Sequence, residues 1–513
     1  MSTPSPLEKS DREVEVKLEG SPDLLASLFD LELLATATVR PRAQRLVAAY
    51  FDTRDDALDR AGISLRLRKN GARCLMNLKW TLQKSDGFSR GEVEAPFHDD
   101  QPDVSIFGPE ISERVMRATG GEALVPRFET RVRRRTAELR LSSSVLEIVI
   151  DEGEIVASES RVKISECELE LKDGDPATLF SFAAQLTMRA GLRLNPSSKS
   201  RRGFLLARGE KPAEVRATGL QLETAASIED AMRAVIQDCL TQFVENWPAL
   251  LDRDLPESVH QMRVALRRLR AALGLFEKAL PGTGFKRFRE DAKRAANALG
   301  PARDQDVFIA LVSEGPLKAF PAEPSFQALL AASSAERLDA YRKARETICA
   351  PETSRFVLEL QAFLASRGWR NQLGTDDLKK LGRPARSLAD EALEQLYRRA
   401  RKLGKELMAA EPDQRHRLRI ILKNLRYASE FFASLYEAAG VRKFAKAAGA
   451  LQDALGAHND SVSAARLVAQ AAAPSTSPAA GIVMGWCARE ITSPEPYLND
   501  QWLAFKSARC FWR

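Results

Sequence analysis

The sequence predicts an α+β protein of two domains, in which a strand-rich N-terminal domain is followed by an all-helical C-terminal domain. Three observations support this prediction. Segments that alternate charged and aliphatic residues recur through about the first 170 positions. Beyond Leu206 they give way to helical spacing of alanine, leucine and arginine. Within this second part, a pattern of basic residues returns at a constant offset of 156 positions, which indicates an internal duplication.

The first alternating segment is Glu13-Val14-Glu15-Val16-Lys17-Leu18. Because successive side chains of a strand point to opposite faces, Glu13, Glu15 and Lys17 share one face and the three aliphatic residues share the other. One such strand is ordinary, since a half-buried strand has one apolar and one solvated face. The recurrence of the pattern is what requires an explanation.

At least six further segments pair a charged face with an apolar one: Leu65–Arg68, Asn77–Trp80, Arg90–Glu94, Phe128–Arg133, Leu146–Asp151 and Glu166–Leu171. Two interpretations remain open. The charged face could meet water, although the like charges at 166, 168 and 170 would then repel one another. Alternatively, the sheet could close into a barrel with its charged face inside. Such crowding is costly unless a metal-bound polyanion compensates it, with carboxylates on the metal and arginines on phosphate.

The N-terminal part resembles CYTH domains, the triphosphate tunnel metalloenzymes. The likeness begins with Glu13-x-Glu15-x-Lys17 and continues in the family's order with Tyr50-Phe51-Asp52-Thr53, Leu65-Arg66-Leu67-Arg68, Leu78-Lys79, Arg90-Gly91-Glu92-Val93-Glu94, Glu166 to Glu170, and Ser198-Lys199-Ser200. It covers about the first 205 residues. The resemblance implies an eight-stranded antiparallel β-barrel with flanking helices, whose interior binds a triphosphate and a divalent metal, Mg²⁺ or Mn²⁺.

The resemblance also implies roles for individual residues. The expected metal ligands are Glu13, Glu15, Glu168 and Glu170. The expected phosphate contacts are Lys17, Arg66, Arg68, Lys79, Arg131, Arg133 and Lys199. Glu92 and Glu94 resemble acids of the middle of the barrel, which hold the basic residues in place or assist a second metal. Together with Glu13, Glu15 and Lys17 they form the predicted catalytic set, and Asp151 and Glu166 rank below the other acids.

The charge balance changes between the two parts. Residues 1–210 carry 32 Lys+Arg and 34 Asp+Glu, whereas residues 211–513 carry 45 and 36. The basic excess of the second part predicts a polyanionic partner there. We expect a first domain over residues 10–208, a linker over 209–224 and a helical domain over 225–513.

Two basic stripes define the duplication. One consists of His260, Arg263, Arg267 and Arg270, and the other of His416, Arg419, Lys423 and Arg426. Each runs beside an apolar seam at helical spacing. The stripes, the Leu-Gly-x-x-x-Asp segments at 299–304 and 455–460, and Phe511-Trp512 resemble the CHAD domain over about residues 225–513. That family is associated with inorganic polyphosphate. Metal chelation by His260, His416 and His458 is an alternative, but His260 and His416 lie in stripes of cations, which disfavour a metal ion.

These patterns predict a metal-dependent inorganic triphosphatase that hydrolyses tripolyphosphate, with a helical domain that binds longer polyphosphate or docks on polyphosphate granules. Two alternatives remain: a non-catalytic polyphosphate-binding adaptor, and an enzyme acting on thiamine triphosphate or ATP. Nucleic acid is not the expected partner, because the helical part offers few aromatic residues for stacking. Six scattered cysteines and a polar N-terminus without an apolar core lead us to expect a cytoplasmic protein that is not bound to a membrane. The sequence leaves the oligomeric state open.

Overall fold

The computed structural model describes residues 12–71, 73–82, 87–405, 407, 412–470, 478–492 and 496–513. It divides into two compact units. The first contains residues 1–213 and 349–367, and the second contains residues 214–348 and 368–513. The division at 213 falls inside the expected linker, and residues 209–224 form neither helix nor strand. No helix among the described residues is long and apolar enough to span a bilayer.

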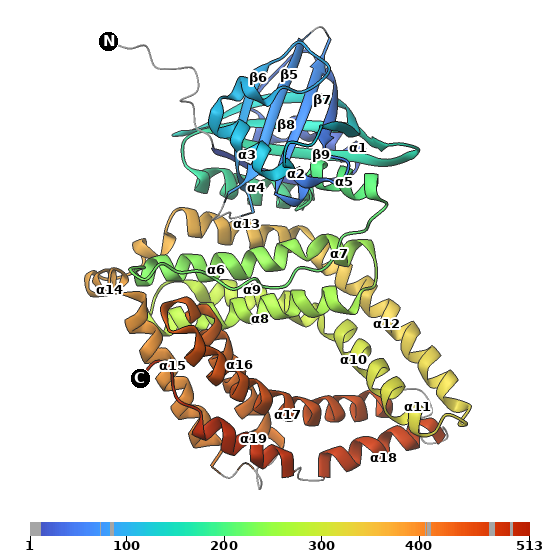
Figure 1. Ribbon diagram of the computed structural model, residues 1–513, viewed down its shortest axis with the longest axis vertical. Coiled ribbons are helices and arrows are strands. Elements are labelled where there is room, and N and C mark those ends of the chain that lie inside the picture. Colours follow the sequence, from blue (N-terminus) through green and yellow to red (C-terminus); the bar gives the residue numbers. More distant parts are fainter. Residues whose placement is uncertain are drawn as a thin grey trace. The chain divides into compact units, whose positions relative to one another are not determined.

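The first unit is an antiparallel barrel of eight strands with short helices around it (Figure 1). Around the barrel the strands follow the order β1, β6, β5, β4, β3, β7, β8, β9, and β9 pairs with β1 to close the ring. The barrel strands are β1 (Arg12–Glu19), β3 (Gln44–Asp52), β4 (Ile63–Asn70), β5 (Arg73–Thr81), β6 (Ser89–Pro96), β7 (Val125–Leu141), β8 (Ser144–Ala157) and β9 (Ser160–Asp173). Two short strands, β2 (Thr38–Val39) and β10 (Arg193–Leu194), pair with β7 and β1. The predicted α+β class and eight-stranded barrel are confirmed.

Helices cover the apolar outer face of the barrel. The helices of this unit are α1 (Pro22–Ala26), α2 (Ala57–Arg60), α3 (Pro109–Thr119), α4 (Pro176–Ala190), α5 (Lys199–Arg208) and α13 (Pro351–Ala365). Leu65, Leu78 and Trp80 pack into one apolar cluster with Leu58 of α2 and Ile111 of α3. Burial of these side chains is the main force that holds the helices on the barrel.

Helix α13 lies far along the sequence but belongs to the first unit. It packs against α4, and the hydroxyl of Ser354 accepts a hydrogen bond of 2.8 Å from the backbone N–H of Leu194. The segment 349–367 therefore belongs to the first unit, although the residues on both sides of it belong to the second.

One end of the barrel interior is filled by apolar side chains. Helix α5 places Phe204 there, at 1% exposure, among Tyr50, Phe128, Val132 and Ile155. The rings of Tyr50 and Phe128 stack with centroids 4.4 Å apart, and Phe204 meets Phe128 edge-on at 5.0 Å. A Cβ at Gly203 would lie only 2.0 Å from the Phe128 ring, so glycine is what allows α5 to approach this closely.

The second unit is all-helical. Its helices are α6 (Ile228–Glu245), α7 (Trp247–Asp252), α8 (Pro256–Ala279), α9 (Phe285–Ala298), α10 (Gly300–Glu314), α11 (Pro316–Ala319), α12 (Ser325–Cys349), α14 (Thr375–Leu381), α15 (Ala385–Leu403), α16 (Pro412–Phe431), α17 (Ala438–Gln470), α18 (Pro478–Thr492) and α19 (Pro496–Ser507). The duplication pairs α6 with α15, α8 with α16, and α9 plus α10 with the single helix α17. Pro301 stands at the start of α10 where α17 has Ala457, which accounts for the break in the first copy.

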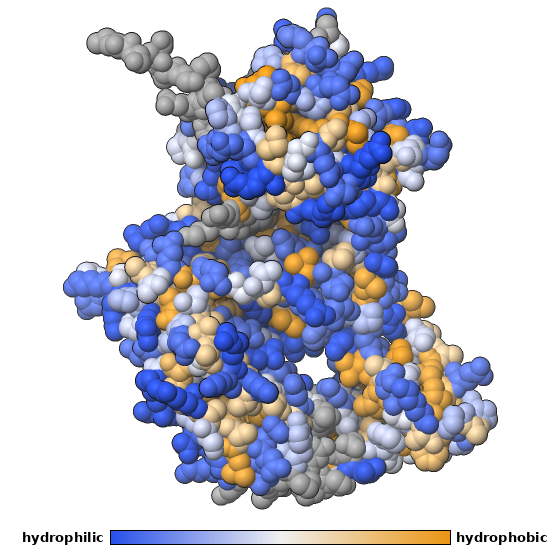
Figure 2. Space-filling model, viewed as in Figure 1, coloured by the Kyte–Doolittle hydropathy of each residue, from blue (hydrophilic) through white to orange (hydrophobic). Residues whose placement is uncertain are grey.

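The two copies meet where their first helices begin. The backbone N–H of Ile228 donates to the carbonyl of Arg383, and the N–H of Ala385 donates to the carbonyl of Ala226, both at 2.9 Å. These reciprocal bonds join equivalent points of the two repeats. In the view of Figures 1 and 2, α8, α10 and α17 border an opening that side chains do not fill.

Removal of the Phe204 ring is expected to destabilise the barrel unit by about 3–5 kcal/mol, because the ring is fully buried and α5 cannot collapse to fill the space. Hydrogen–deuterium exchange of β7 and β8 peptides in Phe204→Ala measures this loss. Phe320→Ala, which truncates a ring that is 50% exposed, is the control and should leave exchange unchanged. Equal exchange in the two variants would show that Phe204 does not support the barrel.

Candidate active site

The charged face of β1 points into the barrel. Pairing with β9 places Glu15 opposite Glu170 and Lys17 opposite Glu168. Glu13 and Glu15 are only 7% and 9% exposed, and Lys17 donates a hydrogen bond to Glu15. The interpretation in which the charged strands face solvent is therefore wrong for β1.

Lys79 connects the acids of two strands. Its ammonium group donates to Glu13 at 2.7 Å and lies 3.4 Å from a carboxylate oxygen of Glu92, its partner in the β5–β6 ladder. Glu92 also accepts a hydrogen bond of 2.6 Å from the side-chain amide of Asn77. Lys79 thus occupies the interior, as predicted, and is bound by carboxylates.

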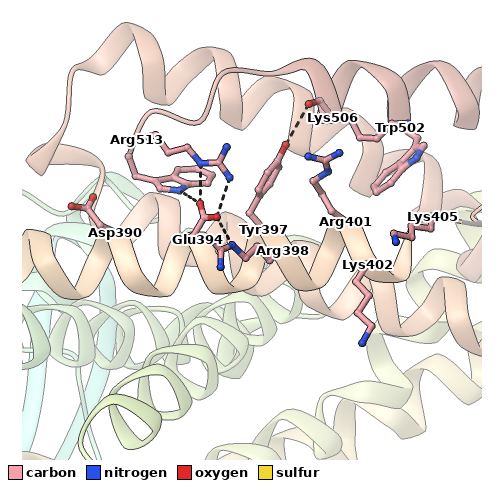
Figure 3. Close-up of a pocket in the computed structure, with 11 residues that line it drawn as sticks. Asp390, Glu394, Tyr397, Arg398, Arg401, Lys402, Lys405, Trp502, Lys506 and Arg513 are labelled. Carbon is pink, nitrogen blue, oxygen red and sulfur yellow. Dashed lines mark hydrogen bonds and ion pairs between the residues drawn. The ribbon is translucent and has the colours of Figure 1, made fainter.

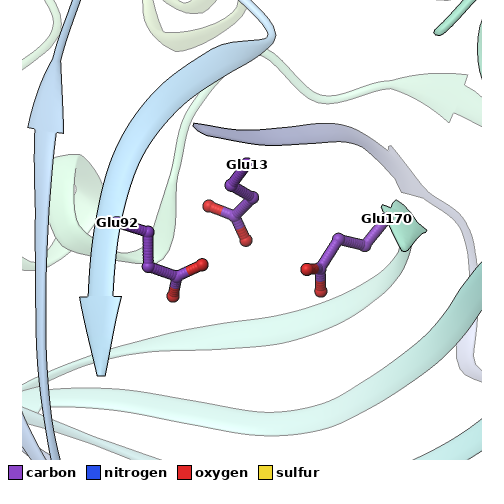
Figure 4. Close-up of side chains that lie close together, drawn as sticks. All are labelled: Glu13, Glu92 and Glu170. Carbon is purple, nitrogen blue, oxygen red and sulfur yellow. The ribbon is translucent and has the colours of Figure 1, made fainter. Parts of the chain in front are cut away.

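Glu13, Glu92 and Glu170 form a carboxylate cluster that could hold a metal ion. One oxygen from each lies within 4.8 Å of the other two, and Figure 4 shows the three side chains converging from three strands. Oxygen ligands of this kind suit hard divalent cations such as Mg²⁺. Of the four expected metal ligands, Glu13 and Glu170 belong to this cluster. Its third member is Glu92, and not Glu15 or Glu168.

The pKa values of neighbouring acids on β1 diverge. Burial, together with the charge of Glu15, raises the pKa of Glu13 to about 7. Burial also acts to raise the pKa of Glu15, but Lys17 and Lys79 outweigh it and lower the pKa to about 2. Burial likewise raises the pKa of Glu170. Concentrated, poorly solvated negative charge at Glu13 and Glu170 is what a bound cation would relieve.

Lys199 occupies a second acidic cluster. Its ammonium group lies 2.8 Å from Asp151 and 3.0 Å from Glu168, and it also pairs with Glu166. Lys199 is the first residue of α5, whose N-terminus is capped by the hydroxyl of Ser198. Its charge lowers the pKa of Glu168 well below the ordinary value, although burial opposes the change. Glu168 is thus held by cations here, away from the carboxylate cluster.

Two guanidinium groups extend inward from β4. Arg68 donates to Glu94 at 2.8 Å, and Arg66 lies 3.4 Å from the hydroxyl of Tyr50. Burial and the adjacent Arg66 lower the pKa of the Arg68 guanidinium, which indicates uncompensated positive charge. An anion between these two side chains would relieve it.

Arg131 and Arg133 were expected to face the barrel interior, but they lie on the outer face of β7. Both are exposed, with side chains at 50% and 63% of full accessibility. The inward positions of this strand hold Phe128, Thr130 and Val132, because the barrel interior is apolar around Phe204. The phase of the alternation is therefore the reverse of the expected one.

Arg134 is the inward cation of β7. It makes a two-pronged ion pair with Asp151, at 2.8 and 2.6 Å, and lies 3.6 Å from Glu168. The sequence offered little warning, because Arg133, Arg134 and Arg135 are consecutive and the side facing the interior cannot be read from three like residues. Asp151, which the alternation of its own strand places on the charged face, is the partner that holds Arg134 inside, and it is fully buried.

The two basic stripes of the second unit lie on α8 and α16, which pack against each other. All eight residues except His416 are half-buried, and His416 is exposed. Arg263 donates to the carbonyl of Ala296 at 2.9 Å. Among the described residues no acceptor reaches the Nε atoms of Arg267 and Arg419, whereas the Nε of Arg426 lies 3.2 Å from a carboxylate oxygen of Glu430.

Positive charge accumulates where the stripes meet. Burial, followed by the charges of Arg267 and Arg419, lowers the pKa of Lys423 to about 7. Burial and Arg303 also lower the pKa of His260. The side chain of His458 lies outside the described residues. Crowded cations of this kind favour an anion and repel a metal ion.

Comparison with known proteins agrees with this architecture. The model of the CYTH domain matches residues 11–204 and that of the CHAD domain matches residues 234–469. An inorganic triphosphatase of Haemophilus influenzae is 29% identical over 199 residues, which are 38% of this chain and 55% of that protein. The match thus spans about half the length of the relative.

A solved structure supports the helical fold. The CHAD domain of the plant Ricinus communis is 29% identical, with a TM-score of 0.51, and the match covers 58% of this chain and 98% of that one. The chain therefore consists of an N-terminal CYTH domain and a C-terminal CHAD domain.

Proposed function

We propose that the barrel hydrolyses inorganic triphosphate with the help of a divalent metal, and that the helical unit binds inorganic polyphosphate. The observation that carries the first half is the cluster of Glu13, Glu92 and Glu170, which lies inside a barrel that also directs Arg66 and Arg68 inward. The likeness to an inorganic triphosphatase supports the choice of substrate.

The carboxylate cluster would hold Mg²⁺ or Mn²⁺, which neutralises charge on the phosphoryl group that is transferred. Arg66 and Arg68 would bind phosphate oxygens, Arg with two bonds at once. Lys17 and Lys199 are further phosphate candidates, although carboxylates hold both here. Glu15 and Glu168 are proposed to fix these lysines and, as the family resemblance implies, to assist metal binding.

Hydrolysis breaks one phosphoanhydride bond as a water oxygen bonds to the terminal phosphorus, giving orthophosphate and diphosphate. The water must lose a proton. Glu94 is our candidate acceptor, because it is partly exposed and is oriented by its 2.8 Å bond with Arg68. Diphosphate leaves with its charge balanced by the same guanidinium groups that bound the substrate.

In the helical unit, the Nε atoms of Arg267 and Arg419, which have no acceptor among the described residues, support binding of a linear polyanion along the two stripes. Such binding would also retain the enzyme on polyphosphate granules.

Glu13→Gln should lower metal-dependent phosphate release from tripolyphosphate by about 100-fold or more, because a bound metal contributes several kcal/mol to transition-state stabilisation. The assay compares tripolyphosphate, thiamine triphosphate and ATP at equal concentration with Mg²⁺ or Mn²⁺, and tripolyphosphate is expected to be the best substrate. Glu110→Gln, at an exposed site on α3, is the control. Undiminished release by Glu13→Gln, or a clear preference for ATP, would refute the proposal.

Arg68→Gln and Arg131→Gln remove one guanidinium from the inner and the outer face of the barrel. We expect kcat/KM for tripolyphosphate to fall about 10- to 100-fold in the first, as for loss of a charged hydrogen bond, and to stay unchanged in the second. Steady-state kinetics measures both. Equal losses in the two variants would mean that the inward and outward faces do not differ in function.

Polyphosphate affinity should depend on Lys423. The groups that face it are Arg267 of α8, Arg419 and Arg426 of α16, and Asp460 of α17. With a pKa of about 7 this lysine is neutral in the free protein above that pH, and a bound polyanion raises the pKa. Binding therefore takes up a proton, and affinity is highest below pH 7 and weakens as the pH rises.

Titration calorimetry with long-chain polyphosphate from pH 6 to pH 9, in two buffers of different ionisation enthalpy, measures this uptake. Lys423→Arg keeps its charge throughout and should show a flatter profile with less proton uptake. The same profile in both proteins would exclude Lys423 as the titrating group.

A further inference from the structure

We propose that a cavity between α15 and α19 is a separate anion site for a triphosphate group, that is, three phosphates joined by anhydride bonds. The cavity has a volume of about 1020 Å³ and none of the stripe residues lines it. It lies within the second unit, whereas the carboxylate cluster of the barrel belongs to the first.

Packed aromatic rings and hydrogen bonds support one side of the cavity. Tyr397 of α15 packs edge-on against Trp512 and tilted against Phe505, with centroids 5.8 and 5.5 Å away. Glu394 fixes the adjoining end of the chain, because it accepts hydrogen bonds from the indole of Trp512 at 3.1 Å and from Arg513 at 3.0 Å. Figure 3 shows the hydrogen bonds of Glu394 beside the basic side chains that line the cavity. A binding site needs such pre-ordered support.

Four cations around the cavity have no ion pair among the described residues. Arg398 and Arg513 both pair with Glu394. The remaining four cations are Arg401, Lys402, Lys405 and Lys506. Arg401 and Lys506 instead lie over the rings of Tyr397 and Trp502, at 5.9 and 5.4 Å. Like charges gathered around one hollow repel each other, and a multivalent anion inside it would remove the repulsion.

The duplication provides an internal comparison. Arg401, Lys402 and Lys405 correspond, at the offset of 156, to Glu245, Asn246 and Ala249 of the first copy. Asn246 there exchanges two hydrogen bonds with the backbone of Val215, at 2.8 and 2.9 Å, so a chain segment covers that face. The helical repeat therefore does not require cations at these positions, and the second copy carries them on a face that is hollow.

The chemistry of the lining favours a triphosphate over other anions. Trp502 is only 5% exposed and lies under Lys506, so no open aromatic surface is offered for stacking of nucleic-acid bases. An acidic peptide carries about one charge per residue along some 3.3 Å of chain, whereas linked phosphates concentrate several charges within a small cavity. Inorganic tripolyphosphate and the triphosphate of a nucleotide share this chemistry.

The test is calorimetric titration of the full chain with sodium tripolyphosphate in EDTA, which keeps divalent metal out of the barrel. Arg401→Gln/Lys405→Gln removes two charges from the cavity. Arg399→Gln/Lys443→Gln removes two from exposed positions that do not line it. We expect one binding event to weaken at least tenfold in the first variant and none to weaken in the second.

Parallel titrations with ATP distinguish the two sources. Weakening for both ligands in the cavity variant indicates a site for any triphosphate group, and weakening for tripolyphosphate alone indicates the inorganic form. Identical titrations of the two variants would overturn the proposal. It would also be overturned if a glutamate peptide of equal charge bound with the same affinity and the same sensitivity, because the site would then recognise acidic protein. Binding in EDTA does not depend on hydrolysis in the barrel, so failure of one proposal is distinguishable from failure of the other.

Discussion

The barrel depends on mutual neutralisation of charges that closure of the sheet turns inward. Charges removed from water are tolerated only when partners replace the lost solvation. Lys79 does this for Glu13, Lys199 for Asp151 and Glu168, and Arg134 for Asp151. The compensation is incomplete at Glu13, whose pKa is raised to about 7, and at Arg68, whose pKa is lowered. These two places, one short of positive charge and the other of negative, are where a metal and a phosphate chain would complete the balance.

Because each buried charge needs a partner, only part of the barrel interior is charged. Phe204 of α5 fills one end of the barrel with an aromatic cluster, and the first residue of the same helix, Lys199, reaches the acidic cluster. One helix therefore closes the barrel and supplies a cation to it. In the helical unit compensation is again incomplete, because Lys423 faces Arg267, Arg419 and Arg426, and Asp460 offsets only part of their positive charge.

Much of the barrel could be predicted because strict alternation fixes which face each residue occupies. Alternation groups Glu13, Glu15 and Lys17 on one face, and the resemblance to CYTH domains predicts that the charged face is the inner one, where Glu13, Glu15 and Lys79 lie. The phase on β7 could not be predicted, since Phe128 and Val132 point inward to meet a helix that lies some 70 residues further along the chain. Glu92 as a partner of Glu13 and Glu170 depends on barrel curvature, and the assignment of α13 to the barrel unit depends on tertiary packing. Neither leaves a periodic signal in the sequence.

The most direct test of the account is a crystal structure with Mn²⁺ and a non-hydrolysable tripolyphosphate analogue, using the anomalous signal of manganese to place the metal. The account predicts a peak within bonding distance of Glu13, Glu92 and Glu170, with Lys79 displaced from Glu13 and the analogue along Arg66 and Arg68. Manganese found only outside the barrel, with Lys79 still bound to Glu13, would contradict it.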